Sequence, residues 1–254
     1  MTPVGAQPKV ECRPNRGSLT GMHRRLFLVA LAVAPFAAAQ ESTPTAAEVL
    51  ARVRQSYALQ DHRMTGRLRD STSGREEALE LSLSQSLMRF HFPGAPAETI
   101  QLDLTTHPAT LWHIQTNGDL KRVPLANSER PVRGMDFNYE DLSQRFLYWD
   151  KVQMLNANAR VTGGVRCWLV RVTAPDTQGP YYAVDLWVHQ DSGGVARMDA
   201  YDSRSTLVKR FEVTKMWKVD NVSSLREMRV QSFNPADGTR KGITYMTLDK
   251  PEHQ

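Results

Sequence analysis

Apolar and polar side chains alternate with a period of two along several stretches of this chain, and no other feature constrains its fold as strongly. In residues 79–84, leucine occupies every second position, and glutamate or serine occupies the positions between. The same alternation recurs in residues 88–92, 100–104 and 183–189. Because successive side chains of a β-strand point to opposite faces, these runs predict half-buried strands. We therefore expect a mainly β protein with a minor helical part (α+β).

Short turn signals separate the strand-like runs. They contain glycine, asparagine and proline, which adopt the tight conformations of hairpin turns. The clearest are Asn117-Gly118, Gly163-Gly164, Gly179-Pro180, Ser192-Gly193-Gly194 and Asp237-Gly238. The strand-like runs are not each followed by a helical stretch. The pattern therefore favours an antiparallel meander over a parallel α/β sheet. Residues 40–254 contain no linker and no repeat, so we expect one domain with about 10–11 strands.

A helix is predicted at the start of this domain. Thr45 and Glu48 have the spacing of a capping box, in which each side chain accepts a hydrogen bond from a free amide at the helix start. Arg52, Arg54 and Gln55 fall elsewhere on the helical wheel, so one face stays apolar. That face consists of Ala46, Val49, Leu50, Val53 and Tyr57. The helix therefore needs an apolar surface to lie on.

A second helix is predicted within the strand-rich region. Asn138 can cap it, with Asp141 three residues further on. One apolar stripe would follow, made of Tyr139, Leu142, Phe146 and Trp149. Such a stripe is typical of core packing, but it also suits a lid, because helices must cover the apolar face of a large open sheet. Both interpretations stay open.

Residues 22–39 have the three parts of a cleavable secretory signal peptide. Residues 23–25 are positive, residues 26–36 are apolar, and three alanines precede Gln40. The apolar part is about half of the ~20 residues that span a bilayer, so we do not expect it to remain as a membrane helix. Residues 1–21 are interpreted as a mis-assigned start or a disordered extension.

Charge and cysteine content restrict the partners and the compartment. The formal net charge is +5, but five of the 32 basic and one of the 27 acidic residues precede Gln40, so the remainder is nearly neutral. Nucleic acid is therefore not an expected partner. Cys167 is the lone cysteine after the leader and falls in a strand pattern, so we expect it to be buried and unpaired. No cysteine follows the leader directly to carry a lipid anchor. The protein is expected to be a soluble periplasmic monomer.

Sequence motifs for catalysis and metal binding are missing. Asp136, Asn138 and Glu140 have the spacing of a calcium loop, but Asp141 replaces its glycine and Leu147 its final glutamate. No zinc-protease motif, nucleophile elbow or phosphate loop is present. We expect no metal, no cofactor and no enzymatic activity. A hydrolase site assembled from dispersed histidines and aspartates is a third, weaker alternative.

The second half of the chain resembles a known family. Residues 134–142 read GMDFNYEDL. Four strand-like blocks follow at residues 164–170, 182–188, 197–202 and 207–211. In this order and spacing they resemble the LolA-like outer-membrane lipoprotein-sorting proteins. The resemblance covers roughly residues 45–250 and is firmest over 130–250.

This resemblance implies a curved, half-open antiparallel β-barrel with a few helices covering its mouth. It also implies a periplasmic role in shielding the acyl chains of a lipoprotein, or another lipid, between the inner and outer membranes. An acyl chain gains about 0.8 kcal/mol per methylene on leaving water, so a carrier needs an apolar concave face and a cover that opens. No lipid-contacting residue of the known carrier aligns cleanly. Apolar candidates for the cavity or lid are Phe90, Trp112, Met135, Phe137, Tyr139, Leu142, Phe146, Trp149, Leu186 and Met198.

A second function, from a different class, stays open. The chain could be a non-catalytic accessory protein that docks on an inner-membrane exporter without holding lipid. A wide apolar cavity would favour the carrier, whereas a closed and well-filled concave face would favour the accessory protein. Converging His, Asp and Glu side chains in a cleft would favour an enzyme.

Overall fold

The fold is described from a computed structural model of the protein. The structure describes residues 43–58, 62–84, 86–175, 179–219 and 222–251. The predicted extension and signal peptide, residues 1–39, lie outside the described residues.

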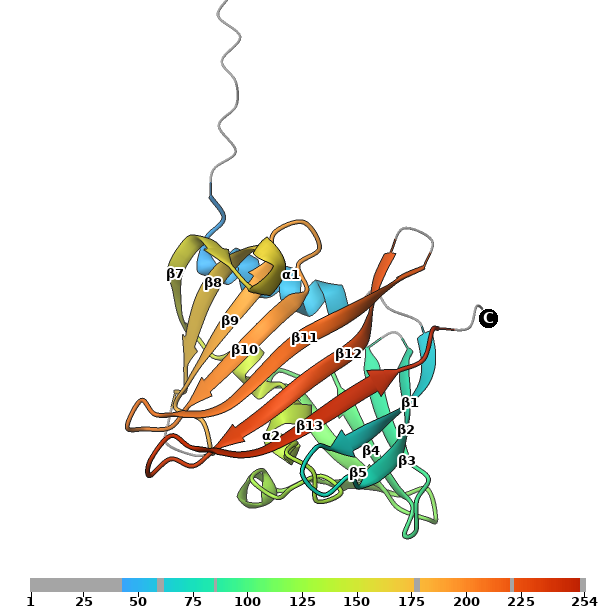
Figure 1. The fold of residues 1–254 in the computed structure, drawn as a ribbon. Helices are drawn as coiled ribbons and strands as arrows, with labels where there is room; N and C mark the ends of the chain where they lie inside the picture. Colours follow the sequence, from blue (N-terminus) through green and yellow to red (C-terminus); the bar gives the residue numbers. More distant parts are fainter. Residues whose placement is uncertain (1–42, 59–61, 85, 176–178, 220–221, 252–254) are drawn as a thin grey trace, which may run out of the picture. The chain divides into compact units, whose positions relative to one another are not determined.

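Thirteen strands, counted over the described residues, form one antiparallel sheet (Figure 1). They are β1 (His62–Asp70), β2 (Glu76–Ser84), β3 (Leu87–Phe92), β4 (Glu98–Asp103), β5 (Thr110–Ile114), β6 (Leu120–Arg122), β7 (Lys151–Arg160), β8 (Arg166–Thr173), β9 (Ala183–His189), β10 (Val195–Tyr201), β11 (Leu207–Val219), β12 (Val222–Phe233) and β13 (Arg240–Leu248). The predicted antiparallel, mainly β fold is confirmed, but the predicted strand number is too low. Strands such as β6, whose three residues are all exposed, lack the apolar alternation on which the prediction rests.

The strand order explains how the chain covers its own sheet. The order is β6-β5-β4-β3-β2-β1-β13-β12-β11-β10-β9-β8-β7. Two meanders therefore meet where β1 pairs with β13, with Leu68 opposite Met246. β6 and β7 follow each other in the sequence but form opposite edges of the sheet. Residues 123–150, which connect them and are termed the covering segment, must therefore pass from one edge to the other.

One face of the sheet is apolar and buried. In the first meander Leu81 lies opposite Phe90, which in turn lies opposite Ile100. In the second meander Leu186 lies opposite Met198. All five side chains belong to the buried core. Figure 1 shows the sheet curling around α2, which belongs to the covering segment, so this apolar face is the concave face of a half-open barrel.

The opposite face carries ion pairs. Asp199 on β10 accepts hydrogen bonds from Arg197 at 2.6 Å and from Arg210 on β11 at 2.8 Å. Burial alone would raise the pKa of Asp199, but the bonds from Arg210 and Arg197 outweigh it and lower that pKa. Asp185 on β9 is bound in the same way by Arg171 on β8, at 2.6 Å. Charged pairs thus cover the outer side of these strands.

Helix α1 (Ala46–Ala58) begins as predicted from its capping box. The Thr45 amide donates to the Glu48 carboxylate at 2.7 Å, and the Glu48 amide donates to the Thr45 hydroxyl at 3.3 Å. Val49, Leu50 and Val53 are buried, and the helix packs against β7 and β8 (Figure 1). The part of the predicted apolar face formed by Val49, Leu50 and Val53 therefore lies on the sheet.

The second predicted helix is much shorter than the apolar stripe suggested. α2 spans only Tyr139–Ser143, and a short 3-10 helix, η2, spans Arg145–Tyr148. Gln144 between them adopts a left-handed conformation (φ 49°), which ends α2, and Trp149 is extended. The prediction of one continuous helical stripe is therefore wrong. A further short 3-10 helix, η1, lies at Leu125–Asn127.

Candidate functional site

The covering segment fills the concave face with its own apolar side chains. Seven of its residues belong to the same buried cluster as the strands, which means that this face is not left open in the described structure. They are Val132, Met135, Phe137, Tyr139, Leu142, Phe146 and Leu147.

A buried polar cluster at Asp141 holds the covering segment in place. One Asp141 oxygen lies 2.7 Å from the Lys209 ammonium of β11, and the other accepts a hydrogen bond from the Tyr181 hydroxyl at 2.6 Å. The side chains of Lys209 and Asp141 are only 8% and 1% exposed. Asn138 completes the cluster by donating to Tyr181 and by forming a capping box with Asp141. We term these four residues the Asp141 clamp. Burial and the Asp141 charge raise the pKa of Tyr181, so its hydroxyl stays a donor.

Other polar contacts fasten the covering segment to separate strands. The Tyr139 hydroxyl donates to Glu98 of β4 at 2.6 Å, and Arg133 pairs with Glu77 of β2 at 3.0 Å. Burial, then the bond to Glu98, raises the pKa of Tyr139. The backbone amide of Asp136 donates to Thr244 of β13 at 3.0 Å. Both meanders are therefore tied to the same segment.

The block at residues 134–142, which carries the family resemblance, supplies most of these contacts. Its predicted cap is confirmed, since Asn138 and Asp141 form both bonds of the capping box. Glu140 is buried and pairs with Arg145 at 2.6 Å. Burial raises the pKa of Glu140, and the pairing with Arg145 offsets only part of this effect. The acidic residues of the block thus cap a helix and anchor the covering segment.

A small apolar space lies beneath the covering segment. A cavity of about 20 Å³ lies there, which has room for roughly one water molecule. Its lining is apolar and consists of Leu68, Leu79, Phe90, Phe92, Val132, Phe137, Leu142 and Met246. An acyl chain does not fit in this space unless the covering segment moves.

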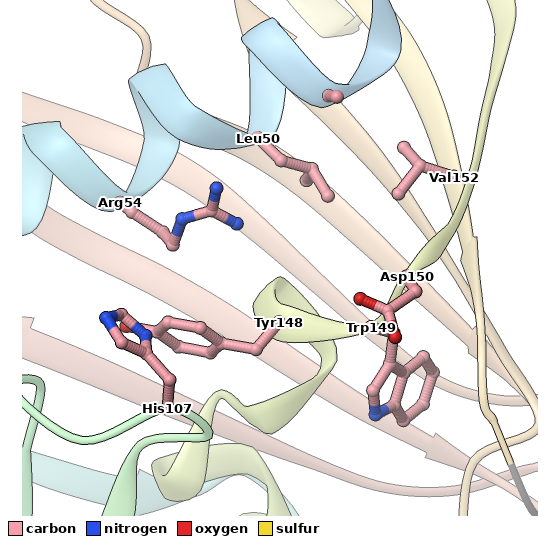
Figure 2. A pocket seen from close by; sticks show the side chains of 8 residues that line it. Leu50, Arg54, His107, Tyr148, Trp149, Asp150 and Val152 are labelled. Carbon is pink, nitrogen blue, oxygen red and sulfur yellow. The ribbon is translucent and has the colours of Figure 1, made fainter.

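A larger cavity of about 310 Å³ opens at the mouth, between α1 and the end of the covering segment (Figure 2). We term it the mouth cleft, and its volume is at the lower end of small-molecule sites. It is lined by Ala47, Leu50, Arg54, His107, Tyr148, Trp149, Asp150 and Val152. Arg54 also ties the two walls together, because its guanidinium donates to the Leu147 carbonyl at 2.6 Å.

The structure brings most of the predicted ligand residues to the concave side, and four of them line one of the two cavities. Phe90, Phe137 and Leu142 line the inner cavity, whereas Trp149 lines the mouth cleft. Buried elsewhere in the core are Met135, Tyr139, Phe146, Leu186 and Met198.

Trp112 does not join this group. It lies next to the buried Leu111 on β5 and opposite Gln101 of β4. Because strand side chains alternate, Trp112 lies on the other face of the sheet from Leu111.

Four polar residues of the mouth cleft are not predicted from the sequence: Arg54, His107, Tyr148 and Asp150. Arg54 follows Leu50 by four residues, so it borders the apolar face of α1 instead of lying elsewhere on the helical wheel as predicted. That spacing could have placed Arg54 beside the apolar stripe. No local signal links His107 to the cleft, because its position depends on how the turn after β4 meets η2.

Metal binding and thiol chemistry were the other kinds of site considered from the sequence. No group of three His, Cys, Asp or Glu side chains among the described residues is placed to hold a metal ion. Cys167 is buried in β8, as predicted, and burial raises the pKa of its thiol to about 11. A thiol in this state is a poor nucleophile at neutral pH.

No helix in the described part of the chain is long and apolar enough to cross a membrane.

The curved sheet and its covered concave face define a LolA-like fold, and solved structures agree. A protein domain named for outer-membrane lipoprotein sorting, from Vibrio parahaemolyticus, aligns with a TM-score of 0.62 at 15% identity, over 82% of this chain and 92% of that chain. A LolA superfamily protein from Nitrosomonas europaea aligns with a TM-score of 0.59 at 15% identity, over 83% and 94%. A DUF1329 family protein from Desulfovibrio piger aligns at 0.57 and 14% identity, over 82% and 92%. At these identities the likeness concerns the fold.

A family model also matches residues 82–253, and its description reads "-like: Uncharacterized protein". The match covers more than half of the chain, so the protein belongs to that family. No curated protein matches the sequence.

Proposed function

We propose that this protein is a periplasmic binding or carrier protein that shields a lipid, or the acyl chains of a lipoprotein, between the inner and outer membranes. The observation that carries the proposal is an apolar concave face covered by a single segment of the same chain. A fold shared with a protein domain named for outer-membrane lipoprotein sorting and with a LolA superfamily protein supports it. The predicted signal peptide at residues 22–39 supports the periplasmic location. We propose no catalytic role.

The covering segment acts in this proposal as a substitute for the ligand. Phe137, Leu142 and Phe146 occupy the concave face, so the empty protein does not expose its apolar surface to water. An arriving acyl chain would replace these side chains. Each of its methylenes that leaves water would stabilise the complex by about 0.8 kcal/mol. The charges of the Asp141 clamp would regain water when the segment lifts, which lowers the cost of opening.

The proposal is tested first by native mass spectrometry of protein purified from the periplasm. A lipid or acylated peptide that remains bound to the protein supports the carrier function. Absence of lipid from this sample, together with no binding of a long-chain fluorescent lipid in solution, would contradict it.

A variant pair then tests whether the covering segment trades places with lipid. Phe146→Ala alters the segment, and Phe92→Ala removes a buried phenylalanine from β3 as a matched control. The control should lower the free energy of unfolding by about 3–5 kcal/mol. Phe146→Ala should cost less and change the affinity for the fluorescent lipid. A loss of ~4 kcal/mol for Phe146→Ala with unchanged lipid binding would identify the segment as ordinary core.

The filled concave face favours one alternative, a non-catalytic accessory protein that docks on an inner-membrane exporter and holds no lipid. The working state of the protein would then be the one with a filled concave face and an inner cavity of about 20 Å³. This alternative predicts that the exported protein crosslinks to an inner-membrane complex and carries no lipid even when the Asp141 clamp is weakened by Lys209→Met. Lipid bound to either form would exclude it.

A further inference from the structure

We propose that the mouth cleft binds a zwitterionic phospholipid headgroup, with the phosphate at Arg54 and His107 and the ammonium at Asp150 and Trp149. The inference rests on the proposed carrier function and names the class of amphiphile that the protein would carry.

The first pole of the cleft is cationic. The Arg54 guanidinium lies 5.5 Å from the centre of the Tyr148 ring, and the His107 ring lies 5.2 Å from the same centre. Tyr148 therefore brings the two basic groups to one end of the cleft (Figure 2). Arg54 uses one N–H on the Leu147 carbonyl, and a guanidinium has five N–H donors in total. The remaining donors suit a phosphate, which arginine binds in a forked geometry.

The second pole carries the opposite charge. Asp150 and Trp149 lie across the cleft from Arg54 and His107 in Figure 2. A carboxylate beside an indole ring is a favourable setting for an ammonium group, through charge pairing and cation–π attraction. Within the described part of the chain, neither Arg54 nor Asp150 forms an ion pair, so both charges are available to a ligand.

The wall between the poles connects the cleft to the core. Leu50 and Val152 line it, and Leu50 is also a member of the buried cluster on the concave face. A headgroup in the cleft would therefore place its acyl chains at the edge of the apolar face. A purely anionic headgroup would meet the Asp150 carboxylate, and a purely cationic one would meet Arg54. The two poles together favour a headgroup that carries both charges.

The test uses short-chain phospholipids that stay monomeric in water. The probes are dihexanoyl phosphatidylethanolamine, dihexanoyl phosphatidylglycerol and dihexanoylglycerol, each titrated into the full exported protein by calorimetry. The phosphatidylethanolamine should bind about tenfold more tightly than the phosphatidylglycerol, as expected for one added charge-assisted contact. Asp150→Asn should abolish this preference, and Arg54→Gln should weaken both phospholipids by about tenfold.

Matched controls separate the cleft from general charge effects. Arg52→Gln removes a neighbouring arginine of α1 whose guanidinium lies over Trp168, outside the cleft lining. Asp191→Asn removes an exposed carboxylate elsewhere. Neither should alter headgroup preference. Asp150 is exposed and has no hydrogen bond or ion pair among the described residues, so Asp150→Asn should fold normally even if Arg54→Gln is destabilised.

The outcomes distinguish this inference from the carrier function. Equal binding of all three probes, unchanged by Asp150→Asn, overturns the headgroup site and leaves the carrier function intact if long-chain lipid copurifies. Selective binding of the ethanolamine probe without any copurified or bound long-chain lipid upholds the headgroup site and overturns the carrier function. No binding of any lipid overturns both.

Discussion

The Asp141 clamp offers the most direct test of how the covering segment is held. We propose a double-mutant cycle with Lys209→Met, Asp141→Asn and the combined variant. Lys209 and Asp141 lie 2.7 Å apart with side chains 8% and 1% exposed, so removing one partner leaves the other buried and unpaired. Each single variant should therefore lose about 3–5 kcal/mol of unfolding free energy.

The combined variant should lose much less than the sum of the two single losses. Once both charges are gone, no unpaired ion remains in the core, and Asn at position 141 can still accept a bond from Tyr181. A coupling energy of about 1–3 kcal/mol is expected, which urea denaturation at neutral pH can resolve. Additivity of the single losses within ~0.5 kcal/mol would refute the argument, because it would mean that the ions are not mutually dependent.

An exposed pair supplies the control for this cycle. Lys215 and Glu227 lie 2.9 Å apart, a similar distance, but their side chains are 52% and 19% exposed. The corresponding substitutions, Lys215→Met and Glu227→Gln, should give a coupling energy below about 1 kcal/mol, because water screens these charges. A coupling at the exposed pair as large as that at the clamp would show that burial is not the cause.

Three further predictions concern export, redox state and acid stability. N-terminal sequencing of exported protein should start at or near Gln40, and an intact Met22 terminus in membranes would contradict a cleaved leader. Because Cys167 is buried, the melting temperature should not change with reductant, and a reductant-sensitive dimer would mean that the thiol is accessible. The pKa of Asp199 is lowered from 3.8, so its ionised form stabilises the fold above that pH, and this contribution is lost as the pH falls through the lowered pKa. Asp199→Asn should therefore be destabilising at pH 7 and far less so in acid, as measured by urea unfolding; an equal loss at both pH values would contradict this.

Local patterns account for what the sequence predicts well. The alternation in residues 79–84 depends only on neighbouring side chains, and it reappears as β2 with Leu79, Leu81 and Leu83 on the buried face. The caps at Thr45 and Asn138 likewise join residues only three positions apart. Such contacts form within one turn of backbone, so residue spacing is enough to infer them.

The predicted second helix is too long because apolar spacing does not report backbone conformation. Leu142 and Phe146 are both buried, as a helical stripe would require. Gln144 between them is left-handed, and the chain turns there toward η2. The covering segment has to follow a curved face, which a single straight helix would not do.

The sequence by itself determined that the chain forms antiparallel strands, where α1 and α2 begin, and that Cys167 is buried. Only the tertiary structure decided which distant residues meet. Asp141 finds Lys209 across 68 positions, and Arg54 reaches Leu147 across 93. These contacts depend on β6 and β7 lying at opposite edges of the sheet, because the covering segment then has to pass from one edge to the other. No periodicity in the chain encodes that crossing, so the clamp and the mouth cleft appear only once the strands are paired.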